Sequence, residues 1–364
     1  MKHTMNKKLL VSVLGLSLPA LWAMPIAAQT GRFLPLPSTS ATTVPATGDV
    51  NPYGIAFVPA GFAAGGPLMP GDTLVSNFNN KANLQGTGST IVRITPAGQT
   101  STFFQGQPGL GLTAALGILR SGFVLVGSLP TTDGTSATVQ QGSLLILNQQ
   151  GVLLANLTDA NLLNGPWYLT IDDQGDRALV FVSNVLNGTV ARLEFSVGTN
   201  GQSLTLNKAF RIADNYVHRL DPAALVVGPS GLAYDAAADV LYVASTGDNA
   251  IFAVANAGSR QTDGGSGTLV YRDNARLHGP LGLAIAPNGH LLVANADAVN
   301  VDANQPSEIV EFTTDGSFVA QISVDANNGG SFNVRLRQAG DSVRFAAVDD
   351  NANTLTMWTI PIEF

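Results

Sequence analysis

The chain has 364 residues, of which 45% are hydrophobic and only 12% are charged, and its formal net charge is −7. This length is compatible with two domains or with one large all-β domain. The acidic balance argues against nucleic acids and anionic membranes as partners, and the absence of cysteine excludes disulfide bonds and thiolate chemistry.

Residues 1–28 have the features of a secretory signal peptide. Lys2, Lys7 and Lys8 form a basic start, Leu9 to Ala23 is an apolar run of 15 residues, and small residues precede a cleavage point after Ala28. The run is short for a membrane-spanning helix, and an uncleaved anchor is the alternative. Cleavage would leave 15 basic and 25 acidic residues, a formal charge of −10. We therefore expect an exported monomer, periplasmic or extracellular, with no membrane span after signal removal.

A short phrase that opens an apolar strand recurs along the rest of the chain. It occurs as Asn51–Phe57, Gly228–Tyr234 and Gly279–Ile285, and in weaker forms as Gly165–Ile171 and Ala115–Ile118. Each copy is followed by a second apolar strand, a polar turn and a third strand. A unit of about 50–60 residues built from short strands is typical of a β-propeller blade.

The outer strands can be followed through six repeats. The predicted second strands are residues 73–77, 123–127, 179–184, 241–245, 290–295 and 343–348. The predicted third strands are residues 90–94, 144–147, 190–195, 250–254, 308–312 and 355–360. Fourth strands are predicted at residues 100–104, 152–157, 204–212, 268–271 and 318–324. The sixth repeat has no fourth strand of its own, because the chain stops at Phe364.

The segment 29–50 contains a stretch that could supply the missing strand of the last repeat. We expect residues around Ser40 to Val44 to add to the sixth blade and close the ring, which removes free sheet edges. The predicted fold is therefore all-β. It is a six-bladed β-propeller over residues 51–364, with four antiparallel strands per blade and a closing strand from the N-terminal segment.

The best copies of the repeat, residues 231–251 and 282–295, give the chain a family resemblance. It resembles the NHL-repeat group of six-bladed propellers and their exported bacterial relatives, the superfamily of SMP-30/gluconolactonase and streptogramin lyase. The resemblance covers most of residues 51–364 and is strongest in the fourth and fifth blades. It implies the fold and leaves the function open, because this group includes binding scaffolds, lactonases and lyases.

A member of the gluconolactonase type would hold a divalent cation at the axis with an early Glu, two Asn and an Asp. The resemblance places one such Asn between the Pro and the Gly of the inner-strand phrase. This chain has Tyr53, Ser230 and Leu281 at those places. The ligand set is therefore missing from the sequence.

A member of the streptogramin-lyase type would need a His base and acidic metal ligands near the funnel mouth. His278 directly precedes an inner strand and is the candidate catalytic base, whereas a structural role bonded to the backbone is the alternative. His218 lies in a long connection and is a weaker candidate. A quinone-dependent sugar dehydrogenase would need a basic pocket, and Arg and His are scarce near the predicted inner strands.

Two groups of side chains are candidates for ligand binding. Tyr53 and Trp167 follow a Pro near the channel mouth, where an aromatic ring can stack on a sugar or another ring; packing between blades is the alternative. Polar residues that follow the second strands would lie on one rim, although turn formation explains them as well. These residues are Asn77, Asn184, Asp248 and Asn295.

One loop resembles a calcium-binding loop. Its oxygen ligands would come from Asp297, Asn300, Asp302 and Asn304. Counting Asn300 as position one, Glu311 stands at position twelve, but Gln305 occupies position six, where such loops need Gly. Calcium or magnesium is thus a candidate cofactor, and a polar hairpin loop is the alternative.

These observations favour a binding or scaffold protein that uses one face of the ring for a polar small molecule, a glycan or a protein. The alternative is a divalent-metal-dependent lyase or lactonase with its site in the central funnel. Whether the chain is an enzyme is left open by its sequence.

Overall fold

The computed structural model describes residues 32–34, 39–198, 201–296, 298–302, 304 and 308–362. The predicted signal peptide lies outside these residues, so signal cleavage and export stay predictions. Within the described part of the chain, no helix is long and apolar enough to cross a membrane.

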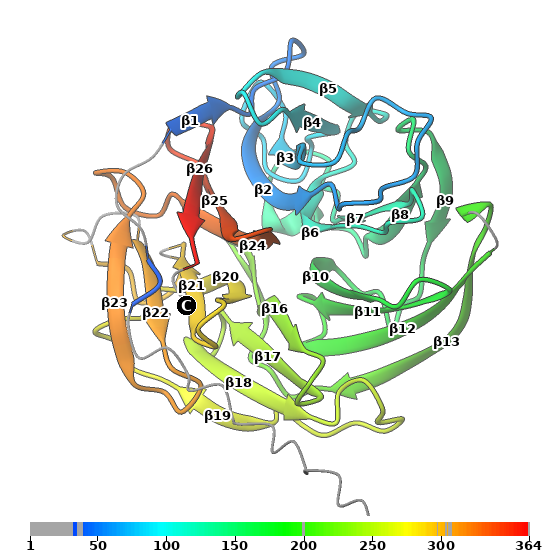
Figure 1. Cartoon of the computed structure of the whole chain (residues 1–364). Coiled ribbons are helices and arrows are strands. Elements are labelled where there is room, and N and C mark those ends of the chain that lie inside the picture. Colours follow the sequence, from blue (N-terminus) through cyan, green and yellow to red (C-terminus); the bar gives the residue numbers. More distant parts are fainter. Residues whose placement is uncertain are drawn as a thin grey trace, which may run out of the picture.

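Six four-stranded antiparallel sheets surround a central axis as the blades of a propeller (Figure 1). Blade 1 contains β2 (Val50–Phe57), β3 (Thr73–Asn79), β4 (Thr90–Ile94) and β5 (Thr100–Gln105), and blade 2 contains β6 (Leu112–Ile118), β7 (Val124–Ser128), β8 (Ser143–Leu147) and β9 (Leu153–Leu157). Blade 3 contains β10 (Pro166–Asp173), β11 (Arg177–Asn184), β12 (Thr189–Val197) and β13 (Leu204–Ala213), and blade 4 contains β16 (Pro229–Asp235), β17 (Val240–Ser245), β18 (Ala250–Ala255) and β19 (Thr268–Tyr271). Blade 5 contains β20 (Pro280–Ile285), β21 (Leu291–Asn295), β22 (Glu308–Phe312) and β23 (Phe318–Ser323), and blade 6 contains β24 (Ser331–Ala339), β25 (Ser342–Asp349), β26 (Thr354–Pro361) and β1 (Thr39–Thr42). The predicted six-bladed propeller is confirmed.

The ring is closed by the first strand of the chain. β1 pairs antiparallel with β26, with Ser40 opposite Thr356 and Thr42 opposite Thr354. Figure 1 shows this blue strand against the red C-terminal strand. The predicted closure is confirmed. Because β1 pairs with β26, the outer edge of β26 is not left unpaired.

A buried carboxylate fastens the segment that precedes β1. The side chain of Glu311 on β22 is fully buried. Its oxygens accept hydrogen bonds from the backbone N–H of Phe33 at 2.9 Å and of Leu34 at 3.2 Å. Asn288 Nδ2 donates to Glu311 Oε1 at 3.1 Å, and His290 Nδ1 lies 2.7 Å from the same oxygen. A buried carboxylate is stable only with such partners. The role of Glu311 is therefore structural: it connects blade 5 to the N-terminal segment.

The inner strands crowd together at the axis, as their small residues predict. A Cβ atom added to Gly282 of β20 would lie 2.6 Å from Asn333 Cα, and one added to Gly54 of β2 would lie 2.7 Å from Leu116 Cβ. Buried aliphatic side chains fill the space between adjacent sheets farther out, as Leu125 of blade 2 and Val180 of blade 3 do in one shared cluster. Glycine is needed where the strands approach most closely.

Two inner strands carry a large side chain in place of that glycine, and these side chains cross the central channel. Tyr168 Oη donates to Asn333 Oδ1 at 2.7 Å, and Asn333 Nδ2 donates to the carbonyl of Tyr53 at 2.8 Å. Both side chains are fully buried. The pair of Tyr168 and Asn333, which we call the axial plug, separates a cavity at one end of the channel from a hollow at the other.

Candidate functional site

The upper cavity lies where the inner strands begin and has a volume of about 320 Å³. Equivalent positions of five inner strands contribute to its wall: Tyr53, Trp167, Ser230, Leu281 and Phe332. The repeat therefore brings side chains that are far apart in sequence to a single place.

Three aromatic rings form one side of this wall. The ring centroid of Tyr53 lies 5.5 Å from that of Trp167, at an interplanar angle of 87°, and 4.7 Å from that of Phe332. Burial and the charge of Asp350 raise the pKa of the Tyr53 hydroxyl well above its usual value. Tyr53 is therefore a neutral group at any physiological pH, and this aromatic side of the wall carries no charge.

A short hairpin outside the six blades covers the cavity. It consists of β14 (Arg219–Asp221) and β15 (Leu225–Val227), which connect blade 3 to blade 4. Ala223 and Ala224 at its tip line the cavity, and Gln85 Nε2 of blade 1 donates to the carbonyl of Ala223 at 3.3 Å. The sequence predicts only a long connection between these blades, so the hairpin is an element that was not predicted.

Asp350 supplies the one carboxyl group among the described residues that line the cavity. Burial and the neighbouring Asp349 raise the pKa of Asp350 to about 7. No hydrogen bond from another described residue reaches its carboxyl oxygens. The hydroxyls of Ser230 and Thr246, in contrast, bond to each other at 2.8 Å. The carboxyl oxygens of Asp350 can therefore accept a hydrogen bond or pair with a charge from a ligand in the cavity.

The structure brings only two of the six predicted ligand-binding residues into this cavity, Tyr53 and Trp167. The amides of Asn77, Asn184 and Asn295 are buried and donate to the carbonyls of Thr43, Leu162 and Arg276, at 3.0, 3.0 and 2.8 Å. Asp248 accepts hydrogen bonds from Val217 N at 3.1 Å and Ser245 Oγ at 2.7 Å. These four side chains hold loops together, and their role in ligand binding stays an untested prediction.

His278, the predicted base, is 2% exposed and does not line the cavity. Its Nδ1 lies 2.7 Å from the carbonyl of Asn300, and its Nε2 lies 4.0 Å from Glu308 Oε1. The imidazole thus faces the interior of blade 5. A catalytic role for His278 stays a prediction that this geometry does not support.

The residues present do not fit a divalent cation at the axis. Within the described ranges, no group of three or more His, Asp or Glu side chains is close enough to share a metal ion. Of the predicted loop ligands, Asp297 lies outside the described residues. Asn300 Nδ2 donates to the carbonyl of Leu277 at 2.8 Å, and Asp302 Oδ1 accepts from the backbone N–H of Asn304 at 2.9 Å. Calcium or magnesium binding by this loop stays a prediction.

Several residues of the channel were missed because the sixth inner strand was not recognised. β24 begins with Ser331-Phe332-Asn333, without the Gly-Pro of the other copies. It places Phe332 in the upper cavity, and its Arg335 and Arg337 line the opposite end of the channel. Arginine is therefore absent from the five inner strands that were predicted, but β24 carries two. Spacing could have revealed the strand, since Gly330 follows Gly279 by 51 residues, the same interval that separates Gly279 from Gly228.

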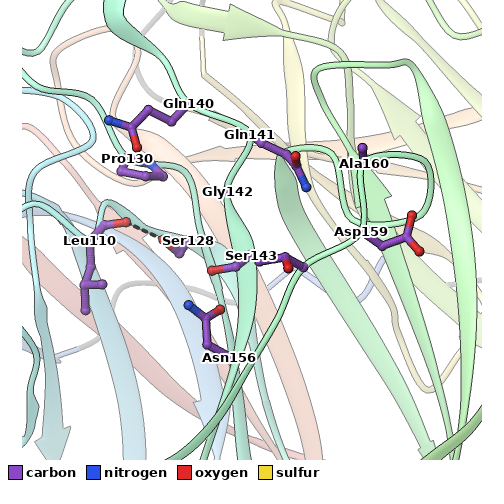
Figure 2. A pocket seen from close by; sticks show the side chains of 11 residues that line it. Leu110, Ser128, Pro130, Gln140, Gln141, Gly142, Ser143, Asn156, Asp159 and Ala160 are labelled. Carbon is purple, nitrogen blue, oxygen red and sulfur yellow. Dashed lines mark hydrogen bonds between the residues drawn. The ribbon is translucent and has the colours of Figure 1, made fainter.

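A second hollow of about 550 Å³ lies on the rim of blade 2 (Figure 2). Its lining is polar and includes Gln140, Gln141, Asn156 and Asp159, and Ser128 Oγ donates to the carbonyl of Leu110 at its base. None of the described residues that line it is aromatic, and it is more open to solvent than the upper cavity. Because ligand sites are usually enclosed and partly apolar, the upper cavity is the candidate site.

Comparison with known proteins supports the fold. The sequence matches no protein-family model, and a comparison with curated protein sequences found no match. Among solved structures, the chain is similar to a gluconolactonase from Xanthomonas campestris, with a TM-score of 0.52 and 14% identity over 89% of this chain and 88% of the other. It is also similar to the calcium-binding protein regucalcin from Agrobacterium tumefaciens, with a TM-score of 0.53 and 14% identity over 90% of this chain and 96% of the other. The resemblance to six-bladed propellers of the gluconolactonase and regucalcin kind is thus confirmed as a likeness of fold.

Proposed function

We propose that this protein binds a small organic cation in the upper cavity. One observation carries the proposal: three aromatic rings and a carboxyl group that accepts no hydrogen bond from the described residues line the same cavity of about 320 Å³. The cavity suits a small molecule, because the β14–β15 hairpin covers it. A protein or a long glycan would need an open surface.

The chemistry of the wall favours a positive charge. The π faces of Trp, Tyr and Phe attract ammonium groups, and aromatic sites of this kind recognise quaternary amines. The carboxylate of Asp350 would add an opposite charge, and the methyl groups of such a ligand would contact apolar walls such as Leu281 and Val226. The acidic net charge of −7 also attracts a cation from solution.

A metal-dependent lactonase is the alternative function. The fold is shared with a gluconolactonase, but structural likeness at 14% identity extends to fold alone. Of the five equivalent inner-strand residues at the cavity, only Tyr53 and Ser230 carry a side-chain oxygen, whereas a hard cation needs several converging oxygen ligands. The proposal therefore assigns the cavity a binding role that does not use a metal.

The first prediction compares two probes of nearly the same shape, choline and its neutral isostere 3,3-dimethylbutan-1-ol. By titration calorimetry, choline is expected to bind with a stoichiometry of one, and the neutral alcohol about tenfold more weakly, since the cation–π and carboxylate contacts are lost. Trp167→Leu should weaken choline binding about tenfold. Trp358→Phe is the matched control, because Trp358 stacks on Phe345 at 4.8 Å within blade 6 and does not line the cavity.

Equal affinity for the alcohol, or an unchanged choline affinity in Trp167→Leu, would contradict the proposal. Binding of D-glucose in place of choline would assign the aromatic wall to sugar stacking.

The second prediction concerns metal removal. Dialysis against EDTA is expected to leave the choline affinity and the thermal midpoint unchanged, and added Ca²⁺ or Mg²⁺ should alter neither, because no carboxylate cluster lies at the axis in the described part of the chain. Metal-dependent hydrolysis of gluconolactone by the purified protein would instead support the lactonase alternative.

A further inference from the structure

The lower end of the channel, beyond the axial plug, is a hollow of about 200 Å³. Its walls come from the middle and last residues of four inner strands, β2, β6, β10 and β24. Most of these residues are aliphatic or aromatic, but Arg335 and Arg337 also line the hollow. The two arginines are two residues apart on β24 and therefore project from the same face of this strand.

Backbone carbonyls hold both guanidinium groups in place. Arg335 donates from Nε to the carbonyl of Ile55 at 3.1 Å and from Nη2 to the carbonyl of Leu169 at 2.6 Å, and its Cζ lies 4.7 Å from the ring centroid of Tyr168. Arg337 donates from Nη1 to the carbonyl of Val58. An arginine has five N–H donors, so each side chain keeps donors for a ligand while its direction is fixed.

The positive charge in this hollow is not neutralised by the described residues. Other arginines have carboxylate partners, as Arg93 has in Asp72 at 2.6 Å and Arg120 in Asp173 at 3.3 Å. Within the described ranges, no Asp or Glu oxygen lies within 4.0 Å of a nitrogen of Arg335 or Arg337.

The pairing of β24 with β25 adds to this charge. Arg344 stands directly opposite Arg337, and like charges in that position destabilise a sheet. Burial and the charge of Arg344 lower the pKa of Arg337. An anion in the hollow would relieve both effects.

We propose that the lower hollow is a binding site for a small organic carboxylate. Its two oxygens would accept the N–H groups that Arg335 and Arg337 keep free, in the paired geometry that guanidinium and carboxylate favour. Its hydrocarbon body would lie against the apolar walls, which include Phe57, Leu116 and Ile171. Inorganic phosphate fits less well, because those walls would face a strongly hydrated ion. The axial plug makes this site independent of the function proposed for the upper cavity.

The experiment compares benzoate with benzamide, which has the same shape and no charge. Titration calorimetry is expected to show one benzoate per chain and at least tenfold weaker binding of benzamide. Arg337→Gln should weaken benzoate binding at least tenfold. Arg120→Gln is the matched control, because Arg120 has its own carboxylate partner and does not line the hollow, and it should bind benzoate as the unmodified protein does.

Folding of each variant is checked by circular dichroism and by its denaturation midpoint. Arg337→Lys keeps the charge and loses the planar fork, so it should bind benzoate with an affinity between those of the unmodified protein and of Arg337→Gln. If Arg337→Gln does not fold, Arg337→Lys decides the question by the same comparison. Equal binding of benzamide, unchanged benzoate affinity in the folded Arg337 variants, or tighter binding of inorganic phosphate than of benzoate would overturn the proposal.

Discussion

Replacing Asp350 with asparagine is expected to stabilise the folded protein at pH 8.5 by about 2 kcal/mol. Burial and the charge of Asp349 raise the pKa of Asp350 from 3.8 to about 7 in the folded state. The folded protein therefore prefers the protonated carboxyl. The protonated carboxyl of Asp350 contributes fully to stability below the pKa that Asp350 has in the unfolded chain. This contribution is lost as the pH rises through about 7, the pKa in the folded state. One pKa unit corresponds to about 1.4 kcal/mol, and solvent at the cavity reduces the full effect.

Urea unfolding at pH 4.5, 6, 7.5 and 8.5 measures this effect. The difference between Asp350→Asn and the unmodified protein should be small at pH 4.5 and should grow up to about pH 7.5. Asp315→Asn is a control of opposite sign, because hydrogen bonds from Thr313 and Ser317 lower the pKa of this exposed carboxyl. That variant should lose a little stability at neutral pH and none at low pH. A stabilisation by Asp350→Asn that does not vary with pH would contradict the assignment.

The same substitution separates stability from binding. A carboxyl group that destabilises the fold at neutral pH is typical of a functional site, where a ligand compensates the charge. Choline affinity of the unmodified protein is therefore expected to rise with pH through about 7, as Asp350 ionises. In Asp350→Asn the affinity should be about tenfold lower and independent of pH over that range. A variant that is more stable and binds less well is the combined result expected.

The fold was largely predictable because its determinants are local and repeated. The phrase at Gly228–Tyr234 and Gly279–Ile285 marks an inner strand wherever it occurs, and alternation of apolar and polar residues marks the strands that follow. The closing strand was expected near Ser40 to Val44 and is Thr39–Thr42. Because the last repeat lacks a fourth strand, pairing with the N-terminal segment was the way to complete its blade.

The candidate site was predictable only in part. Tyr53 and Trp167 could be found because they share one place in the repeat. Phe332 lies on the sixth inner strand, which departs from the pattern, so no repeated motif indicates that it joins the others. Asp350 follows the predicted second strand 343–348, at the place that Thr246 and Ala296 take in blades 4 and 5, so the repeat did carry a signal for it. Asn295 shows a different limit. The sequence places it correctly at the end of a second strand, but the direction of its amide, toward the carbonyl of Arg276, depends on the loop that packs beside it.

Removing residues 29–42 from a chain that starts at Gln29 is expected to abolish most of the stability of the propeller. The truncated chain would lose the pairing of β1 with β26, the buried side chain of Ala41, and the contacts of Phe33 and Leu34 with blades 5 and 6. It would also leave Glu311 buried without its two backbone donors, with only Asn288 and His290 as partners. Each hydrogen bond to a charged group is worth about 1.5–3 kcal/mol, so these losses together are a large part of the roughly 5–15 kcal/mol that stabilises a typical domain.

A further chain separates these contributions in urea unfolding. Glu311→Gln in the longer chain keeps β1 but removes the charge and one acceptor oxygen. It should cost about 3 kcal/mol, because an amide NH₂ cannot accept the hydrogen bonds that the lost oxygen accepts. If the chain that starts at Thr43 unfolded at the same urea concentration as the longer chain, the ring would be stable without its closing strand. The packing of the six blades around the axial plug would then be sufficient to hold blade 1 against blade 6.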